Sequence, residues 1–222
     1  MGYTLALTPA TVFFRLFDRS GRRANEVIRL WGRLLLRTAR VKVEVLGAER
    51  VPQGPVVFAA NHGSYLDIPI MFGGFPCAFR IIYKRSLAAV PFLGWSLWAG
   101  RHLAIDRANP FKARRALAAA AERIHAGTSV VVFPEGTRTG DGDLLPFKRG
   151  SFVLALDAKV PVVPVSIVGS QQRMPNGFGS LTPGTVSIRI HDPIPTENRS
   201  PESAQALAEE ARAVVRHGLT EA

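Results

Sequence analysis

The sequence predicts a single α/β domain with a mixed, largely parallel central sheet flanked by helices, preceded by an N-terminal amphipathic two-helix segment. Three observations support this prediction. From residue 41 onward, short apolar runs typical of strands alternate with segments of helical periodicity. Residues 1–40 instead combine two helical segments with many arginines. The length of 222 residues, 47% of them hydrophobic, suits one domain with its own core.

Two helices are predicted in the N-terminal segment, at residues 10–19 and 22–40, with a break at Ser20-Gly21. In the second helix, apolar residues recur at helical spacing: Val27, Ile28, Trp31, Leu34 and Leu35. The opposite face carries Arg22, Glu26, Arg29, Arg33, Arg37 and Arg40. An arginine-rich face opposite Trp, Phe and Leu is typical of a helix lying in a lipid interface. The alternative is an amphipathic helix packed on its own domain. The neighbouring Phe13, Phe14 and Phe17 favour the membrane.

The remaining residues, 41–222, form the predicted α/β domain. Helical segments are expected near 65–74, over 86–99, from the N-cap Asn109 to the stop at Gly127, near 151–158 and at 201–217. The strands between them are predicted at 41–47, 55–60, 79–84, 101–106, 129–133, 160–169 and 185–192.

The net charge of +11 indicates an anionic partner, which is a nucleic acid, a membrane surface or a phosphorylated substrate. Residues 1–40 contain eight arginines and two acidic residues, so more than half of the net charge lies in the first fifth of the chain. No apolar run approaches the roughly 18 residues that a spanning helix needs. The N-terminus lacks the positive region of a secretory signal. We therefore expect a peripheral or monotopic protein on the cytoplasmic face of the cell membrane, touching an anionic membrane surface and binding no nucleic acid.

Several catalytic classes lack their signatures. There is no G-x-S-x-G elbow, no P-loop and no G-x-G-x-x-G fingerprint. The five histidines are scattered without metal-ligand spacing, so no metal site is expected. The single cysteine, Cys77, excludes an intramolecular disulfide and is interpreted as a small buried side chain.

The stretch "NHGSYLD" (61–67) follows the apolar run "PVVFAA" and allows two interpretations. In the first, Ser64-x-x-Asp67 is a capping box, with Ser64 as N-cap and Asp67 reaching back to its N–H. In the second, Asp67 accepts the Nδ1 proton of His62, which leaves Nε2 as a base beside a substrate hydroxyl. His62 must then lie on the loop and Asp67 in the first helical turn, because residues five apart on a helix point in different directions. The motif alone leaves both interpretations open.

Charged residues also follow two other predicted strands. "FPEGTRTG" (133–140) and "FKRG" (147–150) follow one strand and contain Glu135, Arg138, Lys148 and Arg149. Asp106-Arg107 ends another strand. Sheets of this class place ligands at the carboxyl ends of strands, and a Gly-rich loop with an Arg suits a phosphate oxyanion. A surface ion pair between Glu135 and Arg138 is the alternative for this loop.

Together these motifs resemble the glycerolipid acyltransferase family, which includes bacterial lysophosphatidic acid acyltransferases. The N-H-x4-D block matches Asn61, His62 and Asp67, and the second block matches "GRHLAIDR" through Arg107. The third and fourth blocks match "FPEGTRT" (133–139) and "VPVVPV" (160–165). The four blocks occur in order over roughly half the chain. "KRSLAAVPFLG" (84–94) matches the K-x-E-L…P-x-x-G segment except at Ser86, where Glu is usual.

The resemblance implies that His62 and Asp67 are the catalytic dyad and that Lys84 donates to the reaction's oxyanion. It also implies that the glycerol phosphate head is bound by Arg107, Glu135, Gly136, Thr137 and Arg138. The expected reaction transfers an acyl chain from acyl-CoA or acyl-acyl carrier protein, as co-substrate, to the sn-2 hydroxyl of lysophosphatidic acid, with no other cofactor. The alternatives are acylation of another lyso-lipid, such as a lyso-ornithine lipid, and a non-catalytic basic protein that binds membranes.

Overall fold

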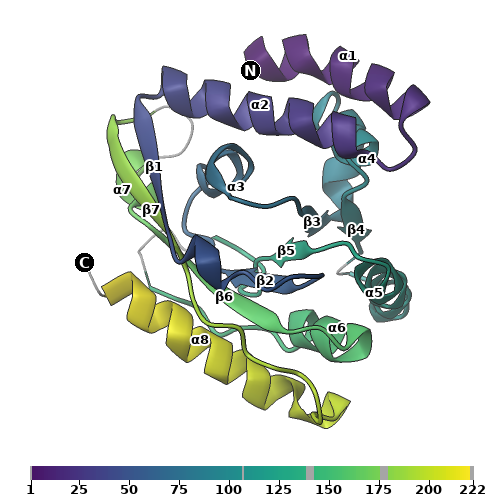
Figure 1. The fold of residues 1–222 in the computed structure, drawn as a ribbon. Helices are drawn as coiled ribbons and strands as arrows, with labels where there is room; N and C mark the ends of the chain where they lie inside the picture. The colour runs from purple at the N-terminus through teal and green to yellow at the C-terminus, as the bar shows by residue number, and fades with distance from the viewer. Residues whose placement is uncertain (1, 107, 139–142, 176–179, 221–222) are drawn as a thin grey trace.

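A computed structural model describes residues 2–106, 108–138, 143–175 and 180–220. A seven-stranded sheet lies between two layers of helices (Figure 1). Helices α2, α3 and α4 cover one face, with α1 packed outside them, and α5, α6 and α8 cover the other. The predicted α/β fold class, with two N-terminal helices before the sheet, is confirmed.

The sheet has the spatial order β1-β7-β6-β2-β5-β3-β4. The strands are β1 (Val41–Leu46), β2 (Val57–Ala60), β3 (Arg80–Lys84), β4 (Leu103–Ile105), β5 (Val130–Val132), β6 (Val162–Val168) and β7 (Gly184–Ile190). β6, β2, β5, β3 and β4 are mutually parallel, whereas β7 runs antiparallel to β6 and β1 runs parallel to β7. Five strands therefore end at the same edge of the sheet.

The helices follow the predicted order with several differences at their ends. They are α1 (Gly2–Phe17), α2 (Arg22–Thr38), α3 (Asp67–Gly74), α4 (Leu93–Ala99), α5 (Pro110–His125), α6 (Gly150–Ala158), α7 (Ser170–Arg173) and α8 (Ala204–Thr220). Short 3₁₀ turns are η1 (Ala48–Arg50), η2 (Arg85–Ala89) and η4 (Pro201–Ser203). The predicted helical stretch 86–99 is divided into η2 and α4, because Phe92 adopts a left-handed φ of 62° between them. α7 was not predicted. Asn109 caps α5 as expected, accepting the N–H of Lys112 at 3.0 Å.

Two apolar cores, one on each face of the sheet, explain the continuous apolar runs of the central strands. Every residue of β2 and β5 is buried, since these strands are paired on both sides and covered on both faces. Phe58, Ile70 and Phe75 belong to the core beneath α2 and α3. Ile124 and Phe152 belong to the core beneath α5, α6 and α8. The strand ends are thus held on a rigid, doubly covered scaffold.

Helix α2 packs closely on α3, so its apolar face is buried against the protein. A Cβ on Gly32 would lie only 2.7 Å from the backbone nitrogen of Gly73, which shows how near the two helices approach. Ile28 and Leu36 are buried beside this crossing. Arg29, expected on the arginine-rich polar face, donates to the carbonyls of Phe75 and Cys77 just after α3, at 2.8 and 3.0 Å. The apolar face of α2 therefore packs on the protein's own domain, which was the alternative interpretation of this helix.

Helix α1 begins at Gly2, eight residues earlier than predicted, and continues through Pro9. Its inner face is held by Thr8, whose Oγ1 lies 2.9 Å from Oγ of Ser96 in α4. Its outer face exposes Phe13, Leu16 and Phe17, with exposed fractions of 56%, 68% and 71%. Among the described residues, no helix combines the length and apolar character needed to cross a membrane. The assignment of residues 1–40 to a membrane interface remains a prediction, and α1 is the helix that presents apolar surface for it.

Candidate active site

The predicted site residues gather where the parallel strands end. "NHGSYLD" follows β2, Glu135 to Arg138 follow the neighbouring strand β5, and Lys84 is the last residue of β3. Arg107, predicted to follow β4, lies outside the described residues. Residues 73 positions apart in sequence, such as His62 and Glu135, thus meet at one edge, as expected for ligand sites in open α/β sheets.

Asn61 anchors the loop after β2 to the adjacent strand β6. Its side-chain Nδ2 donates to the carbonyl of Ile167 at 3.0 Å, and its Oδ1 accepts the N–H of the same residue at 2.7 Å. The amide therefore occupies both backbone groups of Ile167 as a paired strand residue would. This two-bond contact sets where the next residue, His62, leaves the sheet.

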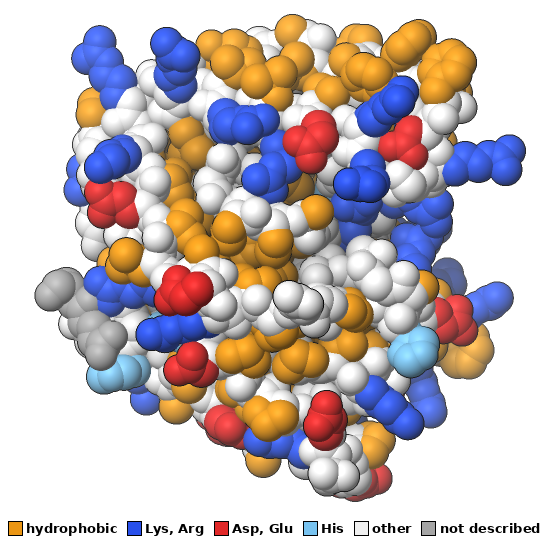
Figure 2. Space-filling model, viewed as in Figure 1, with side chains coloured by type: hydrophobic (Ala, Val, Ile, Leu, Met, Phe, Trp, Pro, Cys, Tyr) orange, Lys and Arg blue, Asp and Glu red, His pale blue; other side chains and the backbone are white. Residues whose placement is uncertain are grey.

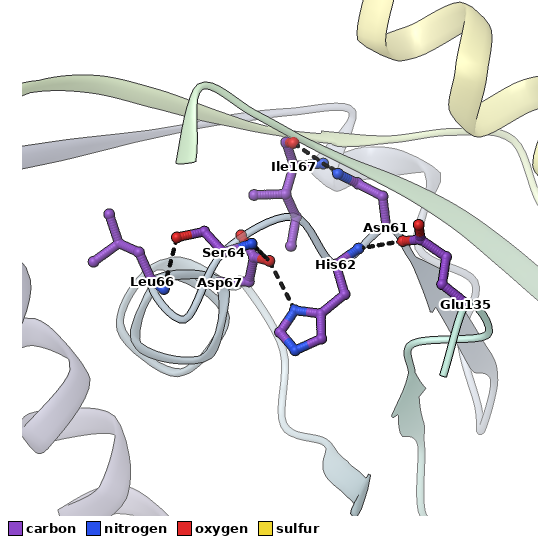
Figure 3. Close-up of polar contacts among 7 residues, drawn as sticks. All are labelled: Asn61, His62, Ser64, Leu66, Asp67, Glu135 and Ile167. Atoms are coloured by element: carbon purple, nitrogen blue, oxygen red, sulfur yellow. Dashed lines mark hydrogen bonds and ion pairs between the residues drawn. The ribbon is translucent and has the colours of Figure 1, made fainter. Parts of the chain in front are cut away.

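His62 and Asp67 form a close pair at the start of α3 (Figure 3). Nδ1 of His62 lies 2.8 Å from Oδ2 of Asp67, and the Asp67 side chain is fully buried. The same Oδ2 accepts the backbone N–H of Ser64 at 2.9 Å, while Ser64 Oγ accepts the N–H of Leu66 at 3.1 Å. Regular helix begins at Asp67, so Ser64 lies in the turn before it and is not the residue next to the first helical position. The capping contact and the histidine–aspartate contact coexist on one oxygen.

The aspartate determines which nitrogen of His62 carries the proton. An ionised carboxylate only accepts, so Nδ1 is the donor and Nε2 carries the free lone pair. The imidazole stacks on Phe133, with ring centroids 4.3 Å apart and planes at 29°, and 12% of its side chain is exposed. Oδ1 of Asp67 is buried, and no described residue donates to it.

Glu135 supports His62 from the neighbouring loop. Its Oε1 accepts the backbone N–H of His62 at 2.6 Å (Figure 3). Its Oε2 accepts the backbone N–H of Leu145 at 3.1 Å. The residue is only 2% exposed, and this burial raises the pKa of its carboxyl group, while the two N–H donors act in the opposite direction. Both oxygens are used within the protein, which supports a positioning role. Binding of substrate by Glu135 remains a prediction.

The other predicted residues lie closer to the surface. Thr137 and Arg138 are exposed, and the guanidinium of Arg138 stacks on Tyr65 at 3.6 Å from the ring centroid, which joins the two loops. Gly136 has a φ of 77°, and a Cβ there would lie 2.5 Å from Nζ of Lys148. Two cationic groups therefore border the loop after β5.

Lys84 is exposed at the end of β3, two strands away from β2, or roughly 10 Å at usual strand spacing. Its predicted role as an oxyanion donor is not established by this placement.

Among the described residues, no group of three or more His, Cys, Asp and Glu side chains is arranged to hold a metal ion. Burial raises the pKa of the Cys77 thiol to about 11, which makes it a poor nucleophile.

The contacting residues that had no role assigned from the sequence include Ile167, Phe133 and Tyr65. Phe133 precedes "PEGTR" directly and Tyr65 lies within "NHGSYLD", so their positions in the two motifs were the available signal. Ile167 had none, because its contact with Asn61 joins residues 106 apart through the sheet.

A largely parallel sheet with a histidine–aspartate pair and an "EGTR" loop at its edge defines an acyltransferase-like architecture. The chain belongs to the acyltransferase family, whose model, described as "Acyltransferase", matches residues 42–168.

Relatives of known name agree with this assignment. The chain is 34% identical to a chloroplastic 1-acyl-sn-glycerol-3-phosphate acyltransferase of Brassica napus, over 90% of this chain and 57% of that protein. It is 32% identical to the enzyme of that name from Pseudomonas aeruginosa, over 90% of this chain and 79% of that protein. The crystal structure of the 1-acyl-sn-glycerophosphate (LPA) acyltransferase PlsC from Thermotoga maritima aligns with a TM-score of 0.79 and 31% identity, covering 97% of this chain and 91% of that one. The chain spans little more than half the length of several curated relatives that it matches.

Proposed function

We propose that this protein transfers an acyl chain from a thioester donor to the sn-2 hydroxyl of lysophosphatidic acid, forming phosphatidic acid. The observation that carries the proposal is the 2.8 Å contact between His62 Nδ1 and the buried Asp67, which leaves Nε2 free to act as a base. The printed names of the relatives support the choice of acceptor.

In the proposed reaction, Nε2 of His62 takes the proton of the acceptor hydroxyl as its oxygen attacks the thioester carbonyl. Asp67 holds the Nδ1–H tautomer and stabilises the imidazolium that forms. A tetrahedral oxyanion results, and its collapse breaks the C–S bond and expels a thiolate, which the imidazolium then protonates. A positioned general base contributes about 10²–10⁴-fold to such a rate. The mechanism proceeds without a covalent enzyme intermediate and requires no metal.

The loop after β5 is the proposed site of the acceptor's phosphate. Arg138 carries the fork of donors that suits a phosphate, and Gly136 and Thr137 bring backbone close to it. Arg107 and Lys84 belong to the same proposed set, as phosphate ligand and oxyanion donor. Because β5 neighbours β2, a lipid held by this loop has its hydroxyl near His62.

The lipid acceptor also implies that the protein works at a membrane. The proposed location is the cytoplasmic face of the cell membrane, with the basic N-terminal helices against anionic lipid. The proposed donors are acyl-CoA and acyl-acyl carrier protein.

The test is turnover of purified protein with lysophosphatidic acid and acyl-CoA, with the product identified by mass spectrometry. We expect phosphatidic acid from the wild type and none above background from His62→Ala. Equal turnover of a lyso-ornithine lipid, which has no phosphate, would contradict the proposed acceptor. Equal phosphatidic acid from both proteins would contradict the role of His62.

A further inference from the structure

A cavity of about 450 Å³ lies at the β4 edge of the sheet, between α1, α4 and α5. It is lined by Arg15 of α1, Trp95 and Trp98 of α4, Arg101 in the turn after α4, and Arg123 of α5. Of the residues predicted for the candidate active site, none that the structure describes contributes to its lining.

The cavity concentrates positive charge without a matching acid. Among the described residues that line it there is no Asp or Glu, and no described carboxylate forms an ion pair with its three arginines. Arg123 is held against the carbonyl of Arg101, and Arg101 donates to the carbonyl of Arg19 at 2.6 Å. Such a cluster of like charges is relieved when an anion binds between them.

A fourth arginine, Arg80, adds to the same positive field. Burial lowers the pKa of both Arg80 and Arg123, and the charge of Arg101 lowers each further. Asp18 acts in the opposite direction on Arg80, but its carboxylate already accepts backbone N–H groups of Ser20 and Arg23. This single carboxylate therefore compensates the positive charge of the four arginines only in part.

One arginine of the cavity is also incompletely bonded. Nε of Arg15 is buried and has no hydrogen-bond partner among the described residues. Its guanidinium lies 5.4 Å from the ring centroid of Trp98. Trp95 and Trp98 are 51% and 55% exposed, so the cavity opens beside aromatic surface. Trp side chains with this mixture of apolar body and polar edge are common at membrane interfaces.

An apolar groove continues from the cavity. It has a volume of about 400 Å³, lies between α1 and α4, and is lined by Thr8, Pro9, Val12, Phe13, Leu16, Phe92 and Trp95. Trp95 is shared with the cationic cavity, so the two spaces adjoin. Hydrophobic side chains gather over α1 along the upper edge of the molecule, and Lys and Arg side chains lie below its right-hand end (Figure 2).

We propose that the cavity and the groove together bind one anionic phospholipid, separate from the lipid that enters the candidate active site. The lipid's phosphate lies among Arg15, Arg101 and Arg123, and the first part of one acyl chain lies along the α1–α4 groove. A cationic space that adjoins an apolar one matches an amphiphile, whereas a free nucleotide would leave the groove empty. The site does not depend on the reaction proposed above, since none of its residues takes part in it.

Binding is tested with dihexanoyl phosphatidic acid below its critical micelle concentration, by isothermal titration calorimetry on the full chain. Dihexanoyl phosphatidylcholine, glycerol 3-phosphate and CoA are the comparison ligands. The cavity pair Arg15→Gln/Arg123→Gln is compared with the control pair Arg22→Gln/Arg115→Gln, which removes two exposed arginines from α2 and α5 outside the cavity. Both pairs lower the net charge equally.

We expect the cavity pair to weaken phosphatidic acid binding on the order of tenfold per arginine, because each charge-assisted hydrogen bond contributes that much. The control pair should change it by less than about threefold, as exposed charges do. Equal losses in both pairs would show diffuse attraction and overturn the site. Phosphatidylcholine bound as tightly as phosphatidic acid would also overturn it, as would CoA bound more tightly with the same arginine dependence.

The groove is tested separately with Phe13→Gln/Leu16→Gln, which alters two exposed side chains and so leaves the core intact. This variant should bind dihexanoyl phosphatidic acid more weakly than the wild type does, and it should bind glycerol 3-phosphate equally well. If the variant bound both ligands with wild-type affinity, the groove would not be part of the site. In the wild type, phosphatidic acid with brominated chains should quench tryptophan fluorescence more than brominated phosphatidylcholine does. This measurement decides the question even if a variant fails to fold, and equal quenching would contradict the proposal.

Discussion

Oε1 of Glu135 accepts the backbone N–H of His62 at 2.6 Å, and this bond joins the loops that leave β2 and β5. The carboxylate is buried and its other oxygen holds Leu145. His62 is therefore fixed from two sides, through its side chain by Asp67 and through its backbone by Glu135. The "EGTR" motif thus contributes to the placement of the proposed base as well as to the proposed phosphate site.

Glu135→Gln should lower kcat by about 10–100-fold with a smaller change in KM, since a small misplacement of a catalytic group has an effect of that size. The amide offers one acceptor where two N–H groups need one each, so the free energy of unfolding should fall by about 1–3 kcal/mol. Steady-state kinetics and urea unfolding measure the two effects. Glu122→Gln, on the exposed face of α5, is the control and should change neither. A raised KM at unchanged kcat would instead support substrate binding by Glu135.

Asp67→Asn should remove most activity from a protein that still folds. The amide oxygen can still accept the N–H of Ser64, but the charge that stabilises the imidazolium is lost. We expect a fall in kcat of about 10²-fold or more, as for His62→Ala. Ser64→Ala is the matched control, because it removes only the bond to Leu66 and should lower stability by about 1 kcal/mol while activity remains. If Ser64→Ala lost as much activity as Asp67→Asn, the aspartate's role would be structural.

The strand ends could be predicted from the sequence because buried parallel strands appear as continuous apolar runs, and "PVVFAA" and "SVVVF" are such runs. The polar residues directly after them therefore had to lie at the sheet edge. The contact between Glu135 and His62 could not be predicted, because it depends on β2 and β5 being neighbours although 73 residues separate the bonded groups. The stacking of Arg138 on Tyr65 also depends on β2 and β5 being neighbours.

The N-terminal helices show a different limit. Burial in lipid and burial against protein select the same amphipathic pattern, so the sequence of α2 could not distinguish them. The partner surface of α2, around Gly73 on α3, also depends on a close approach of the two helices, which a hydrophobic pattern does not reveal. The start of α1 was missed because Pro9 is normally a helix breaker.

Gly32→Ala should destabilise the protein although alanine favours helix formation. The added Cβ would lie 2.7 Å from the backbone nitrogen of Gly73 and 2.9 Å from the carbonyl oxygen of Pro69, so the helices must separate. We expect a loss of about 1–3 kcal/mol in the free energy of unfolding, which exceeds the helix-propensity gain of up to about 1 kcal/mol. Gly150→Ala, in α6 with nothing within 4 Å of the new Cβ, is the control and should be neutral or stabilising. Equal effects in urea unfolding would contradict the close crossing of α2 and α3.

His102 should make the protein sensitive to acid. Burial, and secondarily the charge of Arg80, lower the pKa of this imidazole to about 3, while its Nδ1 accepts the N–H of Ile81 at 3.1 Å. In the unfolded chain its pKa returns to about 6.5. Between these values the unfolded state binds a proton that the native state does not, so stability falls as pH decreases from 6.5 toward 3. The contribution of this residue to that loss reaches up to roughly 4 kcal/mol.

His102→Asn separates the titration from the hydrogen bond, since Oδ1 of asparagine can take the position of Nδ1 and accept from Ile81. At pH 7.5 the variant should be less stable by about 1–3 kcal/mol, because the smaller side chain leaves space in the core. Urea unfolding from pH 8 to pH 4 should then show that the free energy of unfolding declines less steeply in the variant than in the wild type. The difference in slope corresponds to the uptake of up to one proton on unfolding. The two curves therefore converge as the pH falls. Parallel curves would mean that His102 titrates in the native state as it does in the unfolded chain, in conflict with its burial beside Arg80.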